Sequence, residues 1–224
     1  VAALMVVTKP ALRADLSFLR ELDTMGLPLK INPLLNLGEA ARHPELALHP
    51  GDYSSYLIRV FEYALENRLS SRLSPLSELM NAIIADKRPS GCIYNPQCCR
   101  DFLCVDHNGS LYPCGRFADV HANALGTVES GITPEGLMAL QRLEERRSVC
   151  LPEECRVCCW LPICNAGCSA DGASRTGKNV PCAVCEDQKK LFHYLHNQGL
   201  KIIKKQLLKE RQRLYQLLEG KNGI

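Results

Sequence analysis

The sequence has no cysteine before Cys92, few aromatic residues and no long apolar stretch. Aromatic residues make up 6% of the chain and the formal net charge is only +3, which argues against a nucleic-acid partner, because such surfaces cluster basic and aromatic side chains. No run approaches the roughly 18 uninterrupted apolar residues of a membrane span. No segment has the pattern of a signal peptide. We therefore expect a cytoplasmic protein with no membrane partner.

The thirteen cysteines all lie between Cys92 and Cys185. A secreted disulfide scaffold is normally short and rich in cysteine throughout. Here a cysteine-free segment precedes a cysteine-dense one. This distribution favours ligation of a metal or a cluster over disulfide formation.

The first 89 residues alternate strand and helix signals. Val1–Thr8 is a short apolar run rich in β-branched residues, Asp15–Met25 has helical spacing, and Leu27–Leu37 predicts a second strand. This β–α–β order implies parallel pairing with a crossover helix, so we predict an α/β fold. Because the sequence begins with Val1 in an apparent strand, we expect it to be the later portion of a longer chain.

Two amphipathic helices are expected to complete this segment. Asp52 is predicted to cap a helix over Tyr53–Asn67. Ser74-Pro75 is predicted to begin a second helix that ends near Asp86. The apolar stripes of both helices indicate packing into a core rather than a binding surface.

The cysteine-rich segment has three recognisable local patterns. Asn108-Gly109 lies between two β-prone runs, which is typical of a two-residue type I′ hairpin turn. Thr133-Pro134 predicts a helix to about Arg147, with Leu137, Leu140 and Leu143 on one side. A long helical pattern follows from Glu186 to Leu218, interrupted at Gly199.

The strongest chemical signal is the run Cys155-x2-Cys158-x5-Cys164-x3-Cys168. Thiolates suit soft metals, and a [4Fe–4S] cluster needs four of them. A second set lies on either side of the run and comprises Cys92, Cys98, Cys99 and Cys114 upstream and Cys182 and Cys185 downstream.

A zinc-binding structural module is the alternative from another functional class. Cys155-x2-Cys158 and Cys182-x2-Cys185 have the layout of a zinc ribbon, which would bind a partner without catalysis. This alternative gives no role to Cys92, Cys98, Cys114, Cys164 and Cys168.

The spacing Cys99-x9-Gly109-x4-Cys114, the CX2CX5CX3C run and a final cysteine together resemble the SPASM domain. This domain binds auxiliary clusters at the C-terminus of many radical S-adenosylmethionine (SAM) enzymes. The segments WLPICNAGC and CEDQKKLF are also similar to the corresponding parts of this domain. The resemblance implies the last strands and helices of a partial (β/α)6 radical SAM barrel over 1–89, a SPASM domain over 90–190 and a C-terminal helix over 191–224.

The resemblance further implies two auxiliary [4Fe–4S] clusters with interleaved ligands. The first would take Cys92, Cys98 or Cys99, Cys114 and Cys168. The second would take Cys155, Cys158, Cys164 and Cys185. Cys98 has the family's x5 spacing from Cys92, whereas Cys99 has its x9 spacing to Gly109, so both stay open as ligands. Cys185 is preferred to Cys182 because a helical run follows Cys185, as in the family. Trp160 is expected to shield a cluster.

The function that the resemblance implies is radical modification of a peptide or protein. A complete enzyme would also hold SAM and a third [4Fe–4S] cluster, and would take electrons from a reductant such as flavodoxin or ferredoxin. The CX3CX2C loop that holds SAM in this family does not occur in the sequence, so this chain alone is expected to be inactive. Thr8, Lys30 and Asn32 are expected near SAM or substrate, because active sites collect at the C-terminal ends of barrel strands.

One position departs from the family pattern. Sulfatase-maturating enzymes carry an aspartate, a general base, directly after the third auxiliary cysteine, whereas Gly115 follows Cys114 here. The departure favours another radical modification over formylglycine formation.

Overall fold

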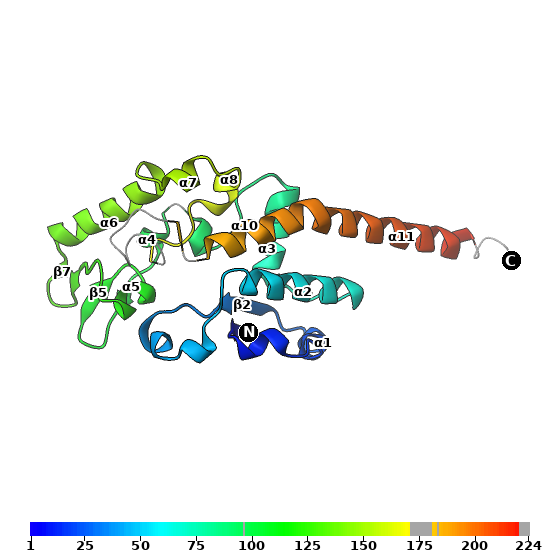
Figure 1. Cartoon of the computed structure of the whole chain (residues 1–224), viewed down its shortest axis with the longest axis horizontal. Coiled ribbons are helices and arrows are strands. Elements are labelled where there is room, and N and C mark those ends of the chain that lie inside the picture. Colours follow the sequence, from blue (N-terminus) through cyan, green and yellow to red (C-terminus); the bar gives the residue numbers. More distant parts are fainter. Residues whose placement is uncertain (96, 171–180, 183, 220–224) are drawn as a thin grey trace.

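The N-terminal segment of the chain is built on a three-stranded parallel sheet with the order β1-β2-β3 (Figure 1). The computed structural model describes residues 1–95, 97–170, 181–182 and 184–219. The elements of this segment are β1 (Ala3–Val7), η1 (Pro10–Arg13), α1 (Phe18–Thr24), β2 (Leu29–Pro33), η2 (Gly38–Arg42), η3 (Pro44–Leu46), α2 (Asp52–Glu66), β3 (Leu73–Ser74) and α3 (Leu76–Ile84). The α/β class and the parallel pairing of the first two strands are confirmed, with Leu4 opposite Lys30 and Val6 opposite Asn32.

Two helix starts differ from the prediction. Asp52 does not cap α2; it is the first helical residue, and the N-cap is Gly51 at φ +91°, a conformation that glycine adopts most easily. Ser74 does not begin a helix but pairs with Lys30 in β3, and α3 starts after Pro75. The short strand β3 escaped prediction because two residues are too few to show an alternating pattern.

The two faces of the sheet have different neighbours. Leu29 and Ile31 of β2 are almost fully buried and belong to the core that α2, α3 and the C-terminal helices complete. On the opposite face Leu4 and Val6 of β1 are 64% and 43% exposed. Lys30 alternates with the buried residues of β2 and therefore lies on this second face.

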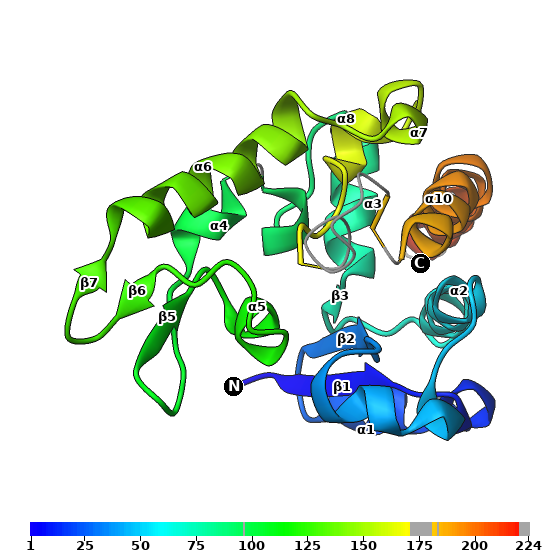
Figure 2. The same cartoon turned by 60° about the vertical axis from the view of Figure 1, so that its left-hand side comes forward.

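The cysteine-rich segment forms a four-stranded antiparallel meander backed by a helix (Figure 2). Its elements are η4 (Cys92–Tyr94), α4 (Cys98–Asp101), β4 (Cys104–Val105), β5 (Ser110–Tyr112), α5 (Gly115–Asp119), β6 (Gly126–Thr127), β7 (Gly131–Ile132), α6 (Pro134–Ser148), α7 (Glu153–Arg156) and α8 (Leu161–Cys164). A second apolar core, with Leu111, Phe117, Leu125 and Leu143 among its buried residues, lies between the meander and α6.

The predicted hairpin exists, but its turn is longer than predicted. The Gly109 N–H bonds to the Asp106 carbonyl, and the Asp106 N–H bonds to the Ser110 carbonyl, each at 2.9 Å. Only Gly109 of the expected pair has a positive φ, +82°, so the connection has three residues instead of a type I′ pair. The Asn108 side chain accepts a hydrogen bond from the Ser110 N–H at 2.9 Å, which stabilises this longer turn.

Helix α6 begins as its sequence predicts. The Thr133 hydroxyl accepts a hydrogen bond from the Gly136 N–H at 3.1 Å, and Pro134 is the first helical residue. Leu140 and Leu143 are buried as expected. Leu137, predicted on the same side of the helix, is 57% exposed and takes no part in this core.

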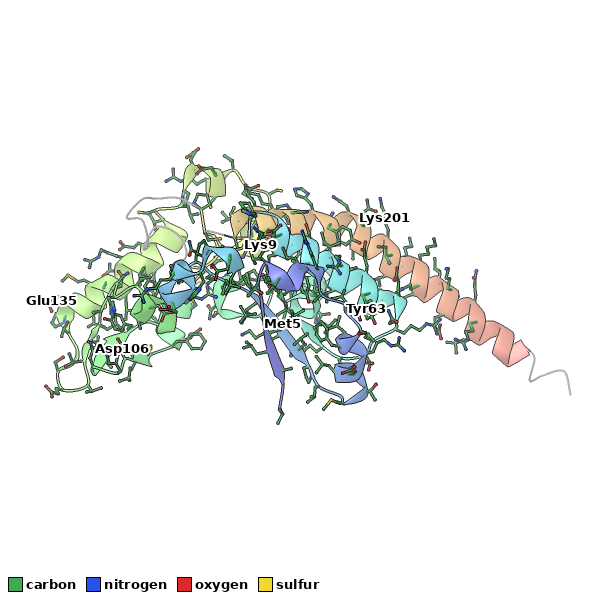
Figure 3. The ribbon with its side chains drawn as sticks, turned by 60° about the horizontal axis from the view of Figure 1, so that its bottom comes forward. Met5, Lys9, Tyr63, Asp106, Glu135 and Lys201 are labelled. Atoms are coloured by element: carbon green, nitrogen blue, oxygen red, sulfur yellow. The ribbon has the colours of Figure 1, made fainter. Side chains whose placement is uncertain are left out.

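The C-terminal helices run on from one another and project beyond the rest of the structure (Figure 1). They are α10 (Cys185–Tyr194), the π-helical turn η5 (Leu195–Gly199) and α11 (Leu200–Glu219). The α-helical pattern is interrupted as predicted, by the π-helical turn that ends at Gly199, although the chain stays helical throughout. A Cβ at Gly199 would lie 3.5 Å from Phe61 and 3.6 Å from Met80, which is ordinary van der Waals contact. Figure 3 shows Lys201 on α11, and Asp106 and Glu135 toward the other end of the molecule. Within the described helices, none is both long and apolar enough to cross a membrane.

A buried carboxylate joins α10 to the start of α2. Asp187 accepts hydrogen bonds from the backbone N–H groups of Ser54 at 2.7 Å and Gly51 at 3.2 Å. These amides belong to the first turn of α2, where no intrahelical acceptor exists. Lys190 adds bonds to the Ser55 hydroxyl at 2.6 Å and to the Gly51 carbonyl at 3.3 Å. The cysteine-rich segment is therefore fastened to the sheet and its helices by a residue that closely follows Cys185.

Replacing this carboxylate is expected to destabilise the chain. Asp187→Ala leaves two buried backbone amides without their acceptor, so the free energy of unfolding should fall by about 1–3 kcal/mol. Urea denaturation measures the change. The matched control is Glu186→Ala, one residue earlier, because the Glu186 side chain is 70% exposed and only pairs with Lys189. A control that loses as much stability as Asp187→Ala contradicts the assignment.

Candidate cluster-binding site and adjoining cavity

Four cysteine side chains line one small pocket formed by α7, α8 and the start of α10. They are Cys155, Cys158, Cys164 and Cys185. Cys155 lies in α7, Cys164 ends α8 and Cys185 begins α10. These are the four residues that the resemblance to the SPASM domain implies for the second cluster, and two separate stretches of the chain contribute them.

Apolar side chains close the same pocket. Trp160 and Phe192 line it, with their ring centroids 5.6 Å apart. Trp160 also makes edge contacts with His193 and His196, at centroid distances of 5.0 and 5.8 Å. An apolar surround of this kind limits solvent access, which is one way in which a protein sets the potential of a bound cluster.

Burial favours the neutral form of three of these thiols, those of Cys155, Cys164 and Cys185, in the metal-free chain. Burial raises the pKa of Cys164 to about 12, and the nearby Cys185, Cys155 and Cys158 contribute to this rise. Burial is also the main reason that the pKa values of Cys155 and Cys185 are raised. Four thiolates so close together repel one another, so they need a cationic centre to stay deprotonated.

A left-handed turn separates Cys164 from Cys168. Asn165, Ala166 and Gly167 have φ values of +51°, +60° and +71°. A Cβ on Gly167 would lie 2.4 Å from the Cys182 sulfur, so this position requires glycine. Cys182 is thus packed against the turn, and it is not among the residues that line the four-cysteine pocket.

The remaining candidate thiols gather around the second core. Cys99 is buried in it, and Cys98, Cys104, Cys114 and Cys168 pack against it. The sulfurs of Cys98 and Cys99 are 4.0 Å apart. Burial raises the pKa of Cys114, and the nearby Cys98 adds to this effect.

A cavity of about 540 Å³ lies between the sheet and the cysteine-rich segment. Cys92, which is exposed in η4, and Cys168 both line it. Lys30 and Asn32 from β2 line it as well, whereas Thr8 does not. The polar groups that complete its wall are Tyr53, Arg72, Ser74, Glu78, Ser90, Tyr94, Arg116, Asp187 and Gln188.

Comparison with known proteins gives one consistent result. No family model matches the sequence. The "Cysteine-type anaerobic sulfatase-maturating enzyme" of Clostridium perfringens strain 13 is 29% identical over 172 residues, which cover 73% of this chain and 45% of that enzyme. An "Uncharacterized protein" of Archaeoglobus fulgidus is 28% identical over 155 residues, which cover 63% of this chain and 35% of that protein. The chain thus spans about half the length of the curated enzyme that it matches.

The chain is homologous to the anaerobic sulfatase-maturating enzymes. Its resemblance to radical SAM enzymes of the SPASM type is thereby confirmed. The fold is similar to that in the structure of native anSMEcpe with bound AdoMet. The two match with a TM-score of 0.69 and 24% sequence identity, over 91% of this chain and 56% of that one. A second structure, of anSMEcpe with AdoMet and the Kp18Cys peptide, has a TM-score of 0.66 at 22% identity and the same coverage.

Position 115 distinguishes this homologue of the sulfatase-maturating enzymes. Gly115 is the first residue of α5, and a Cβ added there would meet nothing within 4 Å. A side chain could therefore begin at this position without a clash of its Cβ, so the backbone does not require glycine here. The next residue, Arg116, lines the cavity.

Several polar residues of the site were not predicted. Gln188 accepts a hydrogen bond from the Cys164 thiol at 2.8 Å, and Asp187 anchors α10. Both lie in the segment CEDQKKLF, whose similarity to the SPASM domain could have indicated that they belong to the site. Glu78 and Arg72 lie in no recognisable sequence motif. Their position on the cavity wall depends on the tertiary fold and cannot be predicted from the local sequence.

The metal-free chain is expected to lose stability as the pH rises above 9. The pKa of Cys164 rises from 9.0 to about 12 on folding. Between these values the unfolded chain binds fewer protons than the folded chain, so the free energy of unfolding falls with increasing pH. Urea midpoints between about pH 8 and 10 measure this decline. Cys164→Ala should show a shallower decline, and an unchanged slope would contradict the assignment.

Proposed function

We propose that this chain is the auxiliary-cluster portion of a radical SAM enzyme that modifies a peptide or protein side chain. The observation that carries the proposal is the grouping of the thiols. Cys155, Cys158, Cys164 and Cys185 line one pocket, while a separate set packs around the second core. Homology to sulfatase-maturating enzymes supports a maturase over other radical chemistry.

In this proposal the parallel sheet is the end of a partial (β/α)6 barrel, and the cysteine-rich segment is a SPASM domain. The strand order β1-β2-β3 with helices between the strands fits successive barrel units. The likeness to anSMEcpe in fold supports the assignment. Residues 1–89 would then form one wall of the substrate cavity, and residues 90–190 the other.

The donor set fits iron–sulfur cubes better than one zinc ion. A cube places each thiolate on a different iron, so its ligands stand further apart than those of a single ion. Among the described residues, no three His, Cys, Asp or Glu side chains converge closely enough for one ion. We assign Cys155, Cys158, Cys164 and Cys185 to one cluster, and Cys92, Cys98 or Cys99, Cys114 and Cys168 to the other.

Bound clusters of this kind supply one-electron chemistry, and the protein supplies the environment. Trp160 and Phe192 would keep water from the second cluster. The Gln188 oxygen accepts from the Cys164 thiol at 2.8 Å in the free chain. A ligating thiolate has no proton to donate, so Gln188 would instead turn its side-chain NH2 group toward the sulfurs of the bound cluster. Such contacts tune cluster potentials.

We assign the 540 Å³ cavity to the peptide and to a portion of SAM. Structures of anSMEcpe contain AdoMet together with the Kp18Cys or Cp18Cys peptide. Lys30 and Asn32 are the proposed polar contacts from the sheet. Flavodoxin or ferredoxin remains the proposed class of electron donor.

Iron loading tests the cluster assignment. The chain reconstituted anaerobically should be brown and hold roughly eight irons. Cys158→Ala should lose about half of this iron and some of the absorption near 400 nm, because one cluster loses a ligand. Cys159→Ala is the matched control, since this neighbouring cysteine is exposed and outside the pocket. Full iron retention in Cys158→Ala, or equal loss in both variants, contradicts the assignment.

The two late cysteines separate the cluster proposal from the zinc ribbon. Cys185→Ala should halve the bound iron, whereas Cys182→Ala should keep it, because Cys182 packs against Gly167 outside the pocket. A zinc ribbon needs both residues as ligands. Stoichiometric zinc, lost equally from both variants, would favour the ribbon.

A further inference from the structure

We infer that Glu78 is a substrate-binding residue whose second carboxylate oxygen accepts a hydrogen bond from an N–H or S–H group of the peptide in the cavity. The inference rests on the proposed function, because it takes this cavity as the peptide site. Glu78 lies in the first turn of α3, directly after β3, and lines the cavity. Its side chain is 9% exposed.

The two oxygens of this carboxylate have different surroundings. Arg72 donates from Nε to Oε1 at 3.0 Å, and its Nη2 contacts the same oxygen. Arginine usually binds a carboxylate through both oxygens. Here both guanidinium nitrogens use Oε1, and Oε2 is buried without a hydrogen-bond partner in the described residues of the chain.

A buried carboxylate oxygen without a donor is unfavourable, more so than a neutral group. Because Oε2 is closed off from solvent in the ligand-free chain, a donor in the cavity bonds to it only when the carboxylate turns Oε2 toward the ligand, and that bond removes this cost. The gain is largest for a ligand that also excludes water, since hydrogen bonds to charged groups are stronger where the local dielectric is low. The arrangement is therefore suited to bind a hydrogen-bond donor on a ligand that fills the cavity.

Glu78 has no competitor for this role among the described residues that line the cavity. The other carboxylate there, Asp187, uses both oxygens to accept the amides of Ser54 and Gly51. The charged side chains Lys30, Arg72 and Arg116 are donors. An incoming N–H or S–H group thus finds its charged acceptor in Glu78.

Substitution by glutamine tests the inference. A carboxylate offers one oxygen to Arg72 and one to the peptide, whereas an amide has one oxygen for both, so Glu78→Gln must give up one bond. We expect the affinity of the iron-loaded chain for the Cp18Cys peptide to fall by about tenfold or more. Iron content and the absorption near 400 nm should not change. Calorimetry and absorption spectra give these values.

Two further variants separate binding from a structural role. Glu66→Gln, at the exposed end of α2, should bind the peptide like the unsubstituted chain. Arg72→Gln removes the ion pair but keeps both carboxylate oxygens, so it should lower the unfolding midpoint without the loss of peptide affinity. Equal losses of peptide affinity in Arg72→Gln and Glu78→Gln would show that the ion pair alone matters and would overturn the inference.

The outcomes also distinguish this inference from the proposed function. Unchanged peptide affinity in Glu78→Gln overturns the role of Glu78 and leaves the function standing. An unsubstituted chain that takes up no iron, or that takes up iron and binds no peptide, overturns the proposed function and the inference together.

Discussion

The docking of α10 on α2 is the contact on which the rest of the site depends. Asp187 accepts the first-turn amides of α2, and Cys185 lies close before it in the same helix. Residues 150–170 contain only short helices, so they cannot fix a distant thiol by packing alone. Because α10 is anchored through a buried carboxylate, the fourth thiol of the pocket is held against the other three.

Backbone geometry likewise governs the division of the thiols into two groups. Three consecutive left-handed residues after Cys164 turn the chain so that Cys168 packs on the second core. The close approach of Gly167 to Cys182 fixes this turn. A run that looks continuous in sequence therefore places Cys155, Cys158 and Cys164 in the four-cysteine pocket and Cys168 against the second core.

Side chains from both segments of the chain line the cavity. Lys30 and Asn32 come from the sheet, Arg72 and Glu78 from the β3–α3 region, and Cys92 from the cysteine-rich segment. Redox groups bound by the thiols would thus lie next to a polar wall that can orient a substrate. Glu78 is the carboxylate of this wall whose second oxygen has no hydrogen-bond partner among the described residues, whereas Gly115, at the start of α5, contributes no side chain.

The sequence by itself determined the features that arise from short-range patterns. These include the parallel β1–β2 pair, the Thr133 cap of α6 and the clustering of the cysteines, because periodicity and capping act within a few residues. Only the tertiary structure decided that β3 exists, that Asp187 anchors α10 on α2 and that Glu78 lines the cavity; it also places Cys185, already preferred from the sequence, in the pocket. These features depend on contacts between segments far apart in the chain, such as Asp187 with Ser54, and local spacing does not encode them.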